Sequence, residues 1–565
     1  MSLAKSFVNA PGQELVEGAI DGLIELSSGQ LTRLAGYEQA VRVVLRSDYQ
    51  KEVIDCGKVS IISGGGSGHE PAHAGFVGTS LLTAAVCGDV FASPTVEAVL
   101  QAILAVTGEG GCLLIVKNYT GDRLNFGLAA ERARALYQKK VEVVTVEDDV
   151  ALDGVPQPRG IAGTCLVHKV ASYYAATGAS LDEVKANAEK AANSVRSIGA
   201  ALTTCTIPGR DTRDERLDGN VYELGLGIHG EAGRETVDLE SAKDIVARML
   251  TPLLKVVGDS KDDFCLLINN LGSVSRVEMT YLFGEVSRQL TDASISVSHV
   301  VEGALVTSLD MCGFSISLLR ICDPTWTKAL EAETNAVGWV PVRQYKKFQS
   351  SNAKALHEHK ASEFAAENSS ADKLNSDIKA KIERAMHSLI ENEAQLTKWD
   401  TICGDGDCGE SISKGAKAVL KDLDSYLDGP AALCNGVATT ISRSVGGTIG
   451  VLSAIFFSAA AAAIQENGSD GALATGFQAG CDSITKHGRA KVGSRTLVDA
   501  LVPASEAASE GINGMAKAAK AGAESTKEMS TATDGRAAYL GDTHDLKGIP
   551  DPGAWAVYLI LSALE

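Results

Sequence analysis

The chain has 565 residues, more than a single hydrophobic core usually holds, so two or more domains are expected. Its composition, with 45% hydrophobic and 22% charged residues, is typical of a globular protein. The formal net charge of −19 argues against a surface for nucleic acid or for an anionic membrane, so we expect neither as a partner.

Cysteine usage and the apolar runs indicate a cytoplasmic protein. The 12 cysteines have no repeated pair spacing, which favours reduced thiols over a disulfide framework. Residues 1–15 lack the basic segment and apolar core of a secretory signal. The longest apolar run, residues 451–464, is shorter than a membrane span and predicts a buried helix.

In residues 1–343, short apolar runs alternate with amphipathic segments. Three of these runs, residues 59–62, 112–116 and 141–146, are each followed by a glycine-rich or polar segment. The alternation predicts an α/β domain over residues 1–343 with mainly parallel sheets.

The composition changes twice after this domain. Residues 344–372 are polar and show no apolar period, so they predict a linker. Beyond it, apolar residues such as Leu374, Ile378 and Ile382 recur at helical spacing. Residues 373–565 are rich in alanine and contain no convincing strand, which predicts an all-helical domain.

Three glycines at residues 64–66 follow the first apolar run. Glycines after a strand usually mark a close approach of the backbone, as in a phosphate cradle or a small-substrate pocket, although both common nucleotide-binding templates fail here. His69 to His73 match the HExxH motif of zinc proteases, but Pro71 disfavours the continuous helix that this motif needs. A tight turn with incidental histidines is the remaining interpretation.

Two later segments also place reactive side chains after apolar runs. Lys117 and Asp122 put a cation and a carboxylate on one segment, which taken alone fits a solvated loop with a local ion pair. His229 lies among glycines, which favours exposure to a ligand. Because ligands of a parallel sheet bind beyond the carboxyl ends of its strands, we expect Gly64, Lys117 and His229 to converge.

The helical domain carries a cluster of carboxylates, Asp400, Asp405 and Asp407. Carboxylates at this spacing suit hard cations such as Mg²⁺, and clustered like charges repel unless they are neutralised. Downstream, the amides around Thr448 can bind phosphate at a helix start, and Arg495 adds a guanidinium group. Carboxylate-bound Mg²⁺, amides and an arginine are typical of phosphoryl transfer.

At these motifs the sequence resembles the ATP-dependent dihydroxyacetone kinase family, and most of all its animal-type branch, the bifunctional triokinase/FMN cyclases. The resemblance rests on four phrases: SGGGSGHEP at 63–71, VKNYTGDRLNF at 116–126, GLGIHGEAG at 225–233 and GDGDCG at 404–409. It covers essentially the whole chain. It implies an N-terminal α/β substrate domain and a C-terminal helical barrel that binds ATP.

The resemblance implies phosphorylation of dihydroxyacetone, and of glyceraldehyde, with His229 bonded to the carbonyl carbon as a hemiaminal. An imidazole adds to a carbonyl but not to an alcohol, so glycerol would be rejected. Asp122 and His69 are implied to orient and deprotonate the attacking hydroxyl, and either can be the base. The implied triose-binding residues are Gly64, Gly65, Gly66, Ser67, Lys117 and Asp122.

The resemblance also implies a nucleotide site in the helical domain. Asp400, Asp405 and Asp407 match the family's ligands for two Mg²⁺ ions that bridge the ATP phosphates. Ile449 departs from the family, which usually carries serine there, so we expect weaker ATP affinity rather than inactivity. The implied ATP-binding residues are Cys408, Gly409, Glu410, Ser411, Thr448, Ile449, Arg495, Thr496, Asp551, Pro552 and Gly553.

The resemblance further implies a homodimer, in which the helical domain of one subunit caps the substrate domain of the other. Animal members also split FAD into AMP and cyclic FMN at the nucleotide site and favour Mn²⁺, so we expect this as a side activity. Two alternatives stay open: a zinc hydrolase built on His69 and His73, and a catalytically weak triose sensor. The aspartate cluster argues against the sensor, because a sensor needs no Mg²⁺ sites.

Overall fold

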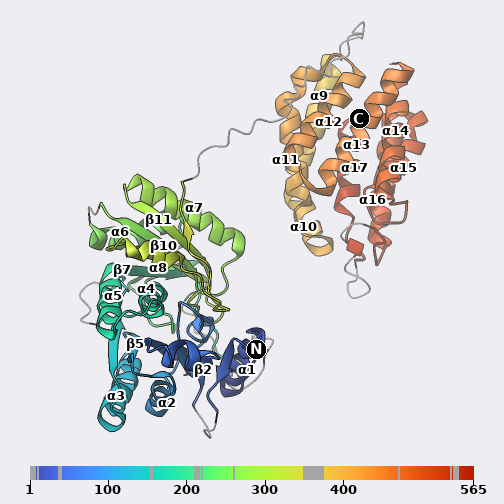
Figure 1. The fold of residues 1–565 in the computed structure, drawn as a ribbon. Coiled ribbons are helices and arrows are strands. Elements are labelled where there is room, and N and C mark those ends of the chain that lie inside the picture. Colours follow the sequence, from blue (N-terminus) through green and yellow to red (C-terminus); the bar gives the residue numbers. More distant parts are fainter. Residues whose placement is uncertain are drawn as a thin grey trace. The chain divides into compact units, whose positions relative to one another are not determined.

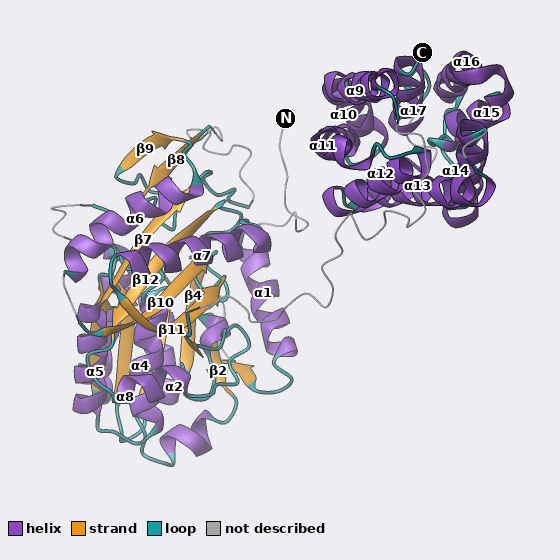
Figure 2. Cartoon of the chain, turned by 90° about the horizontal axis from the view of Figure 1, so that it is seen from above, coloured by secondary structure: helices purple, strands orange, loops and turns teal. Residues whose placement is uncertain are grey.

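The computed structural model describes residues 8, 12–35, 41–152, 157–208, 217, 220–258, 261–347, 374–468, 471–534, 537–538 and 546–565. The chain divides into two compact units, Met1–Ser350 and Ser351–Glu565 (Figure 1). In the described residues, the first unit holds two β-sheets with helices, and the second unit holds helices without a strand (Figure 2). The predicted pairing of an α/β domain with an all-helical domain is therefore confirmed.

The first sheet has six strands in the order β1-β2-β4-β3-β5-β6. The pairs β4–β3, β3–β5 and β5–β6 are parallel, and the pairs β1–β2 and β2–β4 are antiparallel. Every residue of β3 and of β5 is buried, which explains why these runs show no polar alternation. The strands are β1 (Leu31–Arg33), β2 (Val43–Arg46), β3 (Ser60–Ser67), β4 (Ala84–Val90), β5 (Cys112–Lys117) and β6 (Val141–Val146).

The second sheet has seven strands in the order β13-β11-β10-β12-β7-β8-β9. Among its described strands only the pair β10–β11 is parallel, so the prediction of mainly parallel sheets is wrong for this sheet. Strands buried on both faces have the same apolar pattern whichever way their neighbours run, so periodicity does not reveal direction. The strands are β7 (Val195–Ala201), β8 (Val221–Leu224), β9 (Glu235–Asp238), β10 (Asp263–Asn270), β11 (Ser296–Gly303), β12 (Gly313–Arg320) and β13 (Arg343–Gln344).

Helices of the first unit form layers around the two sheets. Helices α2 and α3 pack on the outer face of the first sheet, and α6 and α7 pack on the outer face of the second sheet. Helices α4 and α5 contribute to one core shared by both sheets, so they lie between them. The helices are α1 (Gly12–Leu26), α2 (Val96–Val106), α3 (Thr120–Tyr137), α4 (Thr164–Ala176), α5 (Leu181–Ser194), α6 (Ala242–Val257), α7 (Arg276–Asp292) and α8 (Thr325–Glu331).

Helices of the second unit form a closed ring. Contacts run in the order α9, α11, α12, α13, α14, α15, α16 and α17, and α17 contacts α9 again. The ring encloses an apolar cavity of about 460 Å³. The helices are α9 (Ser376–Glu391), α10 (Glu393–Cys403), α11 (Cys408–Asp422), α12 (Pro430–Ser444), α13 (Gly447–Asn467), α14 (Ala472–Gly488), α15 (Val498–Glu506), α16 (Gly511–Ser525) and α17 (Pro552–Ala563).

Helix α13 contains the longest apolar run of the sequence. By length and composition it is the one helix of the described chain that could cross a membrane, and only 22% of its most apolar window is buried. The prediction of a buried helix is therefore wrong in part. Phe456, Phe457 and Ile464 line the cavity inside the ring, and this position accounts for the apolar character of the helix.

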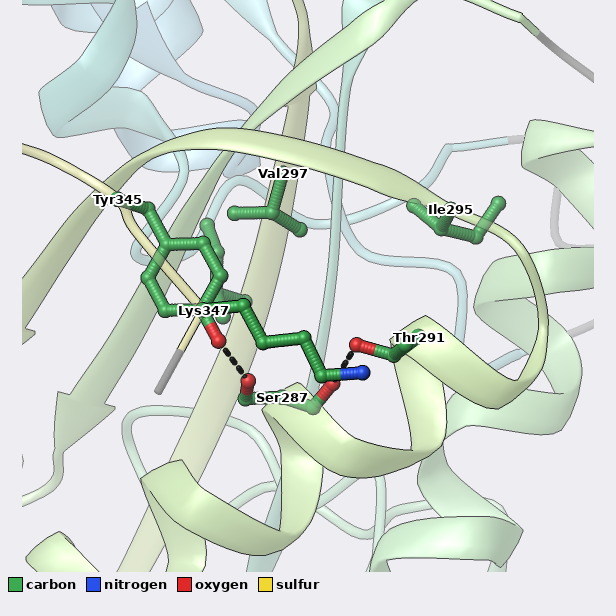
Figure 3. Close-up of a pocket in the computed structure, with 7 residues that line it drawn as sticks. Ser287, Thr291, Ile295, Val297, Tyr345 and Lys347 are labelled. Atoms are coloured by element: carbon green, nitrogen blue, oxygen red, sulfur yellow. Dashed lines mark hydrogen bonds between the residues drawn. The ribbon is translucent and has the colours of Figure 1, made fainter. Parts of the chain in front are cut away.

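The predicted linker begins too early. Gln344 belongs to β13, and the Tyr345 amide donates to Ser298 O at 2.7 Å, so both residues still belong to the second sheet. The Tyr345 hydroxyl bonds that of Ser287 on α7, beside a small cavity of about 190 Å³ into which Lys347 extends (Figure 3). These side-chain contacts join residues 58 positions apart in sequence, which a local pattern does not reveal. Positions 348–372 of the predicted linker lie outside the described residues.

Candidate active site

The three glycines at residues 64–66 lie inside β3 and not in a loop after it, so that part of the sequence prediction is wrong. A Cβ at Gly64 would lie 2.2 Å from the Val86 carbonyl oxygen, and one at Gly66 would lie 2.7 Å from the Ala92 amide nitrogen. The glycines therefore let β4 and the turn after it approach β3 closely.

Gly65 faces the reactive side chains that the sequence singled out. A Cβ at Gly65 would lie 3.3 Å from Lys117 Nζ and 3.5 Å from Asp122 Oδ2. Ser67 lies at the end of the same strand, where its hydroxyl donates to Gly88 O at 2.8 Å. The amine of Lys117 and the carboxylate of Asp122 therefore both border Gly65, which has no side chain to fill the space between them.

Lys117 ends β5, and Asp122 lies in the first turn of α3. Both are buried, with 1% and 4% of their surface exposed, and Asp122 accepts a hydrogen bond from the Ser93 hydroxyl. Burial lowers the pKa of Lys117, and nearby carboxylates, Asp122 first among them, oppose this effect. The site thus holds two buried groups that can carry opposite charges, the amine of Lys117 and the carboxylate of Asp122.

His69 follows β3 directly and is fully buried. Its Nδ1 donates to Thr307 O at 2.8 Å, so the neutral ring carries its proton on Nδ1. Its Nε2 has no hydrogen-bond partner among the described residues. Burial, followed by the charge of Lys117, holds the pKa of His69 well below its usual range. His69 is therefore a neutral imidazole with a free lone pair on Nε2.

The structure contradicts the zinc-hydrolase alternative. The segment from His69 to His73 forms turns and not a helix, so the HExxH geometry is missing. Nε2 of His73 lies 3.1 Å from Lys117 Nζ, a cation that would repel a metal ion. Pro71, which disfavoured the helix in the sequence, accounts for the difference.

His229 lies in the turn after β8, and its own loop fixes the orientation of its ring. Nδ1 donates to Glu231 Oε1 at 2.8 Å, and the backbone amide of His229 donates to Glu231 Oε2 at 2.9 Å. A Cβ at Gly227 would lie 2.0 Å from Glu231 Oε2, so glycine makes room for the carboxylate. With its proton on Nδ1, His229 presents the lone pair of Nε2.

Aromatic rings surround His229 on several sides. The centroid of its ring lies 4.7 Å from Tyr119, 4.9 Å from His69 and 5.1 Å from Phe91, all in edge-on arrangements. The side chain of His229 keeps 20% of its surface exposed. The ring is thus held firmly but stays accessible to a small ligand. The expected convergence of the segments at Gly64, Lys117 and His229 is confirmed, because His69 at the end of β3 contacts His229 and Lys117 borders Gly65.

A buried ion pair clamps the His229 loop to the chain after β6. Arg159 donates to Gly225 O at 2.6 Å, and its guanidinium lies 2.7 Å from Asp149 Oδ2. Arg159, Glu231 and the aromatic residues around His229 were not predicted from the sequence. The glutamate two positions after His229 was a usable signal, whereas no local pattern links Phe91 or Arg159 to a histidine so distant in sequence.

The second unit brings the three predicted metal ligands together. Asp400 lies in the last turn of α10, and Asp405 and Asp407 lie in the segment before α11. Each of the three carboxylates has one oxygen within 4.8 Å of the others. Asp400 Oδ2 accepts from the amides of Asp407 and Cys408 at 2.9 and 3.0 Å, which fixes the loop around it. An all-oxygen set of carboxylates fits Mg²⁺ or Mn²⁺.

Three helix starts hold most of the predicted ATP-binding residues. Cys408, Gly409, Glu410 and Ser411 form the first turn of α11, and Thr448 and Ile449 lie in the first turn of α13. Asp551 caps α17 by accepting from the Ala554 amide at 2.7 Å, and Pro552 and Gly553 follow it. Unpaired amides at such helix starts bind phosphate groups.

The remaining predicted ATP-binding residues, Arg495 and Thr496, lie in the segment before α15. Arg495 is 1% exposed and donates to Ile549 O at 2.8 Å. Burial raises the pKa of Asp551 to about 7, although the hydrogen bond from the Ala554 amide and the charge of Arg495 oppose this effect. The Thr496 amide donates to Asp499 at 2.8 Å. The Ile449 side chain lines the apolar cavity of the ring, together with Ser411 and Gly553.

Known proteins resemble this chain along its whole length. Residues 24–338 match the Dak1 domain and residues 402–565 match the DAK2 domain. A putative 3,4-dihydroxy-2-butanone kinase of Solanum lycopersicum is 42% identical, over 98% of this chain and 96% of its own. The triokinase/FMN cyclase of Homo sapiens is 35% identical, over 93% and 94%.

A crystal structure of the dihydroxyacetone kinase of C. freundii is also similar. It aligns with a TM-score of 0.68 and 37% identity, over 100% of this chain and 99% of its own. A second structure of that enzyme, in complex with AMP-PNP and Mg²⁺, aligns with a TM-score of 0.67.

Proposed function

We propose that this chain, which belongs to the dihydroxyacetone kinase family, phosphorylates dihydroxyacetone and glyceraldehyde with ATP. The observation that carries the proposal is the His229 imidazole, whose proton Glu231 holds on Nδ1 so that Nε2 is free to attack. A buried amine, Lys117, and a buried carboxylate, Asp122, belong to the same set of side chains and can bind the hydroxyl groups of a triose. The aspartate cluster of the second unit supplies the complementary place for a metal-bound nucleotide.

The proposed covalent step follows from the orientation of His229. The Nε2 lone pair forms a bond to the carbonyl carbon, and the π electron pair of the carbonyl moves to its oxygen. The oxygen takes up one proton from water, and the imidazolium releases its Nδ1 proton through Glu231 to water, so the net product is a neutral hemiaminal and Glu231 stays ionised. Glycerol has no carbonyl group and cannot form this bond, which gives the discrimination.

Two groups can accept the proton of the attacking hydroxyl. Asp122 is a buried carboxylate that already accepts from Ser93, and His69 presents a free Nε2 lone pair. Gly64, Gly65, Gly66 and Ser67 form the adjacent wall. A base role for Asp122 predicts that Asp122→Asn abolishes turnover while His69→Gln keeps part of it, and a base role for His69 predicts the reverse.

Asp400, Asp405 and Asp407 would hold two Mg²⁺ ions with the nucleotide. When bound, these ions would neutralise charge on the transferred phosphoryl group. The chain's own part is to fix the three carboxylates and to present helix-start amides from α11 and α13. The C. freundii enzyme, a similar protein, forms a complex with AMP-PNP and Mg²⁺, which supports the binding of a nucleotide and Mg²⁺ by this chain.

We also propose cleavage of FAD to AMP and cyclic FMN at the same metal and phosphate groups, with Mn²⁺ preferred. Relatives at 35–36% identity are named triokinase/FMN cyclase, which is the support for this activity. The family resemblance likewise supports a cytoplasmic homodimer, which sedimentation of the full chain tests. A regulatory role is the weaker alternative, because a similar operon co-activator matches only 57% of this chain.

The test of the lead proposal is phosphate transfer from Mg-ATP to dihydroxyacetone by the full chain. Mass spectrometry or NMR with dihydroxyacetone is expected to find an adduct at His229. His229→Ala is expected to lose the adduct and most of the activity. Full activity and full discrimination against glycerol in that variant would rule out the covalent mechanism.

A further inference from the structure

The buried amine of Lys117 has an unusual partner behind it. An ammonium group removed from water needs acceptors, and Lys117 is only 1% exposed. Its Nζ lies 3.1 Å from Nε2 of His73, a residue to which the proposed reaction assigns no task. On another side the amine borders Gly65, which has no side chain to contact it. One hydrogen of the ammonium is therefore used by His73, and others remain for a substrate.

The chemistry of an ammonium group fixes the tautomer of His73. An ammonium only donates hydrogen bonds, so His73 Nε2 accepts and the neutral ring carries its proton on Nδ1. Burial, and then the positive charge of Lys117, hold the pKa of His73 well below its usual range. The ring therefore stays neutral and serves as an acceptor without adding charge.

A second buried histidine supports the first. The ring of His168 on α4 lies 5.2 Å from that of His73, at an interplanar angle of 66°. His168 is fully buried, and burial together with the charge of Lys117 lowers its pKa to about 3. Two neutral rings thus fill the space behind the amine, where water would otherwise solvate it.

The charged groups that face Lys117 come from four segments. Asp122 on α3, Asp148 after β6, Glu70 after β3 and Glu231 after β8 all favour the ammonium form, whereas burial disfavours it more strongly. The histidines that face it, His69, His73 and His168, are neutral. Burial and the carboxylates act on the pKa of Lys117 in opposite directions. Loss of one hydrogen-bond acceptor is therefore expected to lower this pKa and so to favour the uncharged amine.

We propose that His73 is a positioning residue, which accepts a hydrogen bond from Lys117, keeps the amine protonated and directs its remaining N–H groups toward the triose. The inference rests on the proposed function, because it concerns the same pocket. His168 holds the His73 ring in place from behind.

The test compares two substitutions of His73 in the full chain. His73→Leu removes the acceptor, and His73→Gln supplies an amide oxygen in its place. We expect His73→Leu to raise the KM for dihydroxyacetone about 10- to 100-fold, with a smaller effect on kcat. We also expect the alkaline limb of kcat/KM to move about one to two pH units lower, because the ammonium loses a charge-assisted hydrogen bond. His73→Gln is expected to restore both.

His299→Leu is the matched control. His299 is also a buried histidine of the first unit, but it lies on β11 and bonds its neighbour Ser298 and Glu331 at the end of α8. Its replacement is expected to leave the alkaline limb unchanged. An alkaline limb that stays in place in His73→Leu, or that moves equally in His73→Gln, would overturn the inference.

NMR of the wild-type chain gives a second measurement that needs no variant. The ¹⁵N shifts of His73 are expected to report a proton on Nδ1 and an acceptor at Nε2, and a proton on Nε2 would contradict the inference. This readout is independent of catalysis. A chain that fails to phosphorylate dihydroxyacetone but shows the expected tautomer would refute the proposed function alone.

Discussion

Replacement of Glu231 by glutamine tests how the fold prepares His229 for attack. The carboxylate accepts from His229 Nδ1 at 2.8 Å and from the His229 amide at 2.9 Å. Glu231→Gln keeps the size of the side chain but removes its charge. It also places an NH₂ group, which cannot accept a hydrogen bond, next to one of the two N–H donors of His229. The imidazolium that forms on attack then lacks its counter-charge.

The expected loss of adduct formation follows from the charge-assisted hydrogen bond between His229 and Glu231. Such bonds contribute about 1.5–3 kcal/mol, which corresponds to a fall in adduct formation and in kcat/KM of about 10- to 150-fold. Burial raises the pKa of Glu231, but hydrogen bonds and charge from His229 outweigh it and lower the pKa to about 2. Because the carboxylate stays ionised from about pH 5 to 8, titration of Glu231 itself adds no pH dependence to the loss in that range.

The assay is ¹³C NMR of the full chain with dihydroxyacetone labelled at its carbonyl carbon, since the hemiaminal carbon is no longer a carbonyl. Glu331→Gln is the matched control, because Glu331 accepts from His299 at 3.0 Å in a second histidine–glutamate pair. The control is expected to keep the wild-type adduct population. A wild-type population in Glu231→Gln would refute the assigned role of the carboxylate.

Three further outcomes are expected. Asp405→Asn should abolish Mg-ATP turnover by removing one metal ligand yet keep the His229 adduct, and loss of both would contradict separate sites in the two units. Ile449→Ser should tighten ATP binding about tenfold by adding a hydroxyl near the phosphates, as measured by calorimetry. Leu473→Ser, in the same cavity, should leave the affinity for ATP unchanged, and an unchanged affinity in Ile449→Ser would contradict the expected effect of the hydroxyl. Lys169 is buried, and burial lowers its pKa from 10.5 to about 8, so between these values the unfolded chain binds more protons and stability rises with pH. From pH 8 to 10.5, the free energy of unfolding of the wild type should therefore rise by roughly 3 kcal/mol relative to that of Lys169→Met, as measured by denaturant titration. The same pH dependence in both proteins would contradict this effect of burial.

Much of the site could be predicted from short stretches of sequence, because each stretch carries its chemistry locally. The spacing of Asp400, Asp405 and Asp407 brings three carboxylates together across one loop, and the structure shows that cluster. His69, Lys117, Asp122 and His229 were likewise found from their places after apolar runs. What these patterns left out is the support around them, since Arg159, Phe91 and Ser93 reach the site from other segments.

The division into an α/β half and a helical half follows from the sequence alone, because the apolar period is a local property. Tertiary packing sets the directions of the strands in the second sheet, because strands buried on both faces have the same apolar pattern in either direction. It also decides the role of the glycines at residues 64–66, which depends on how closely β4 approaches β3. Likewise, the HExxH letters carry no zinc geometry here, because Pro71 keeps His69 and His73 off a common helix and the fold places His73 against Lys117.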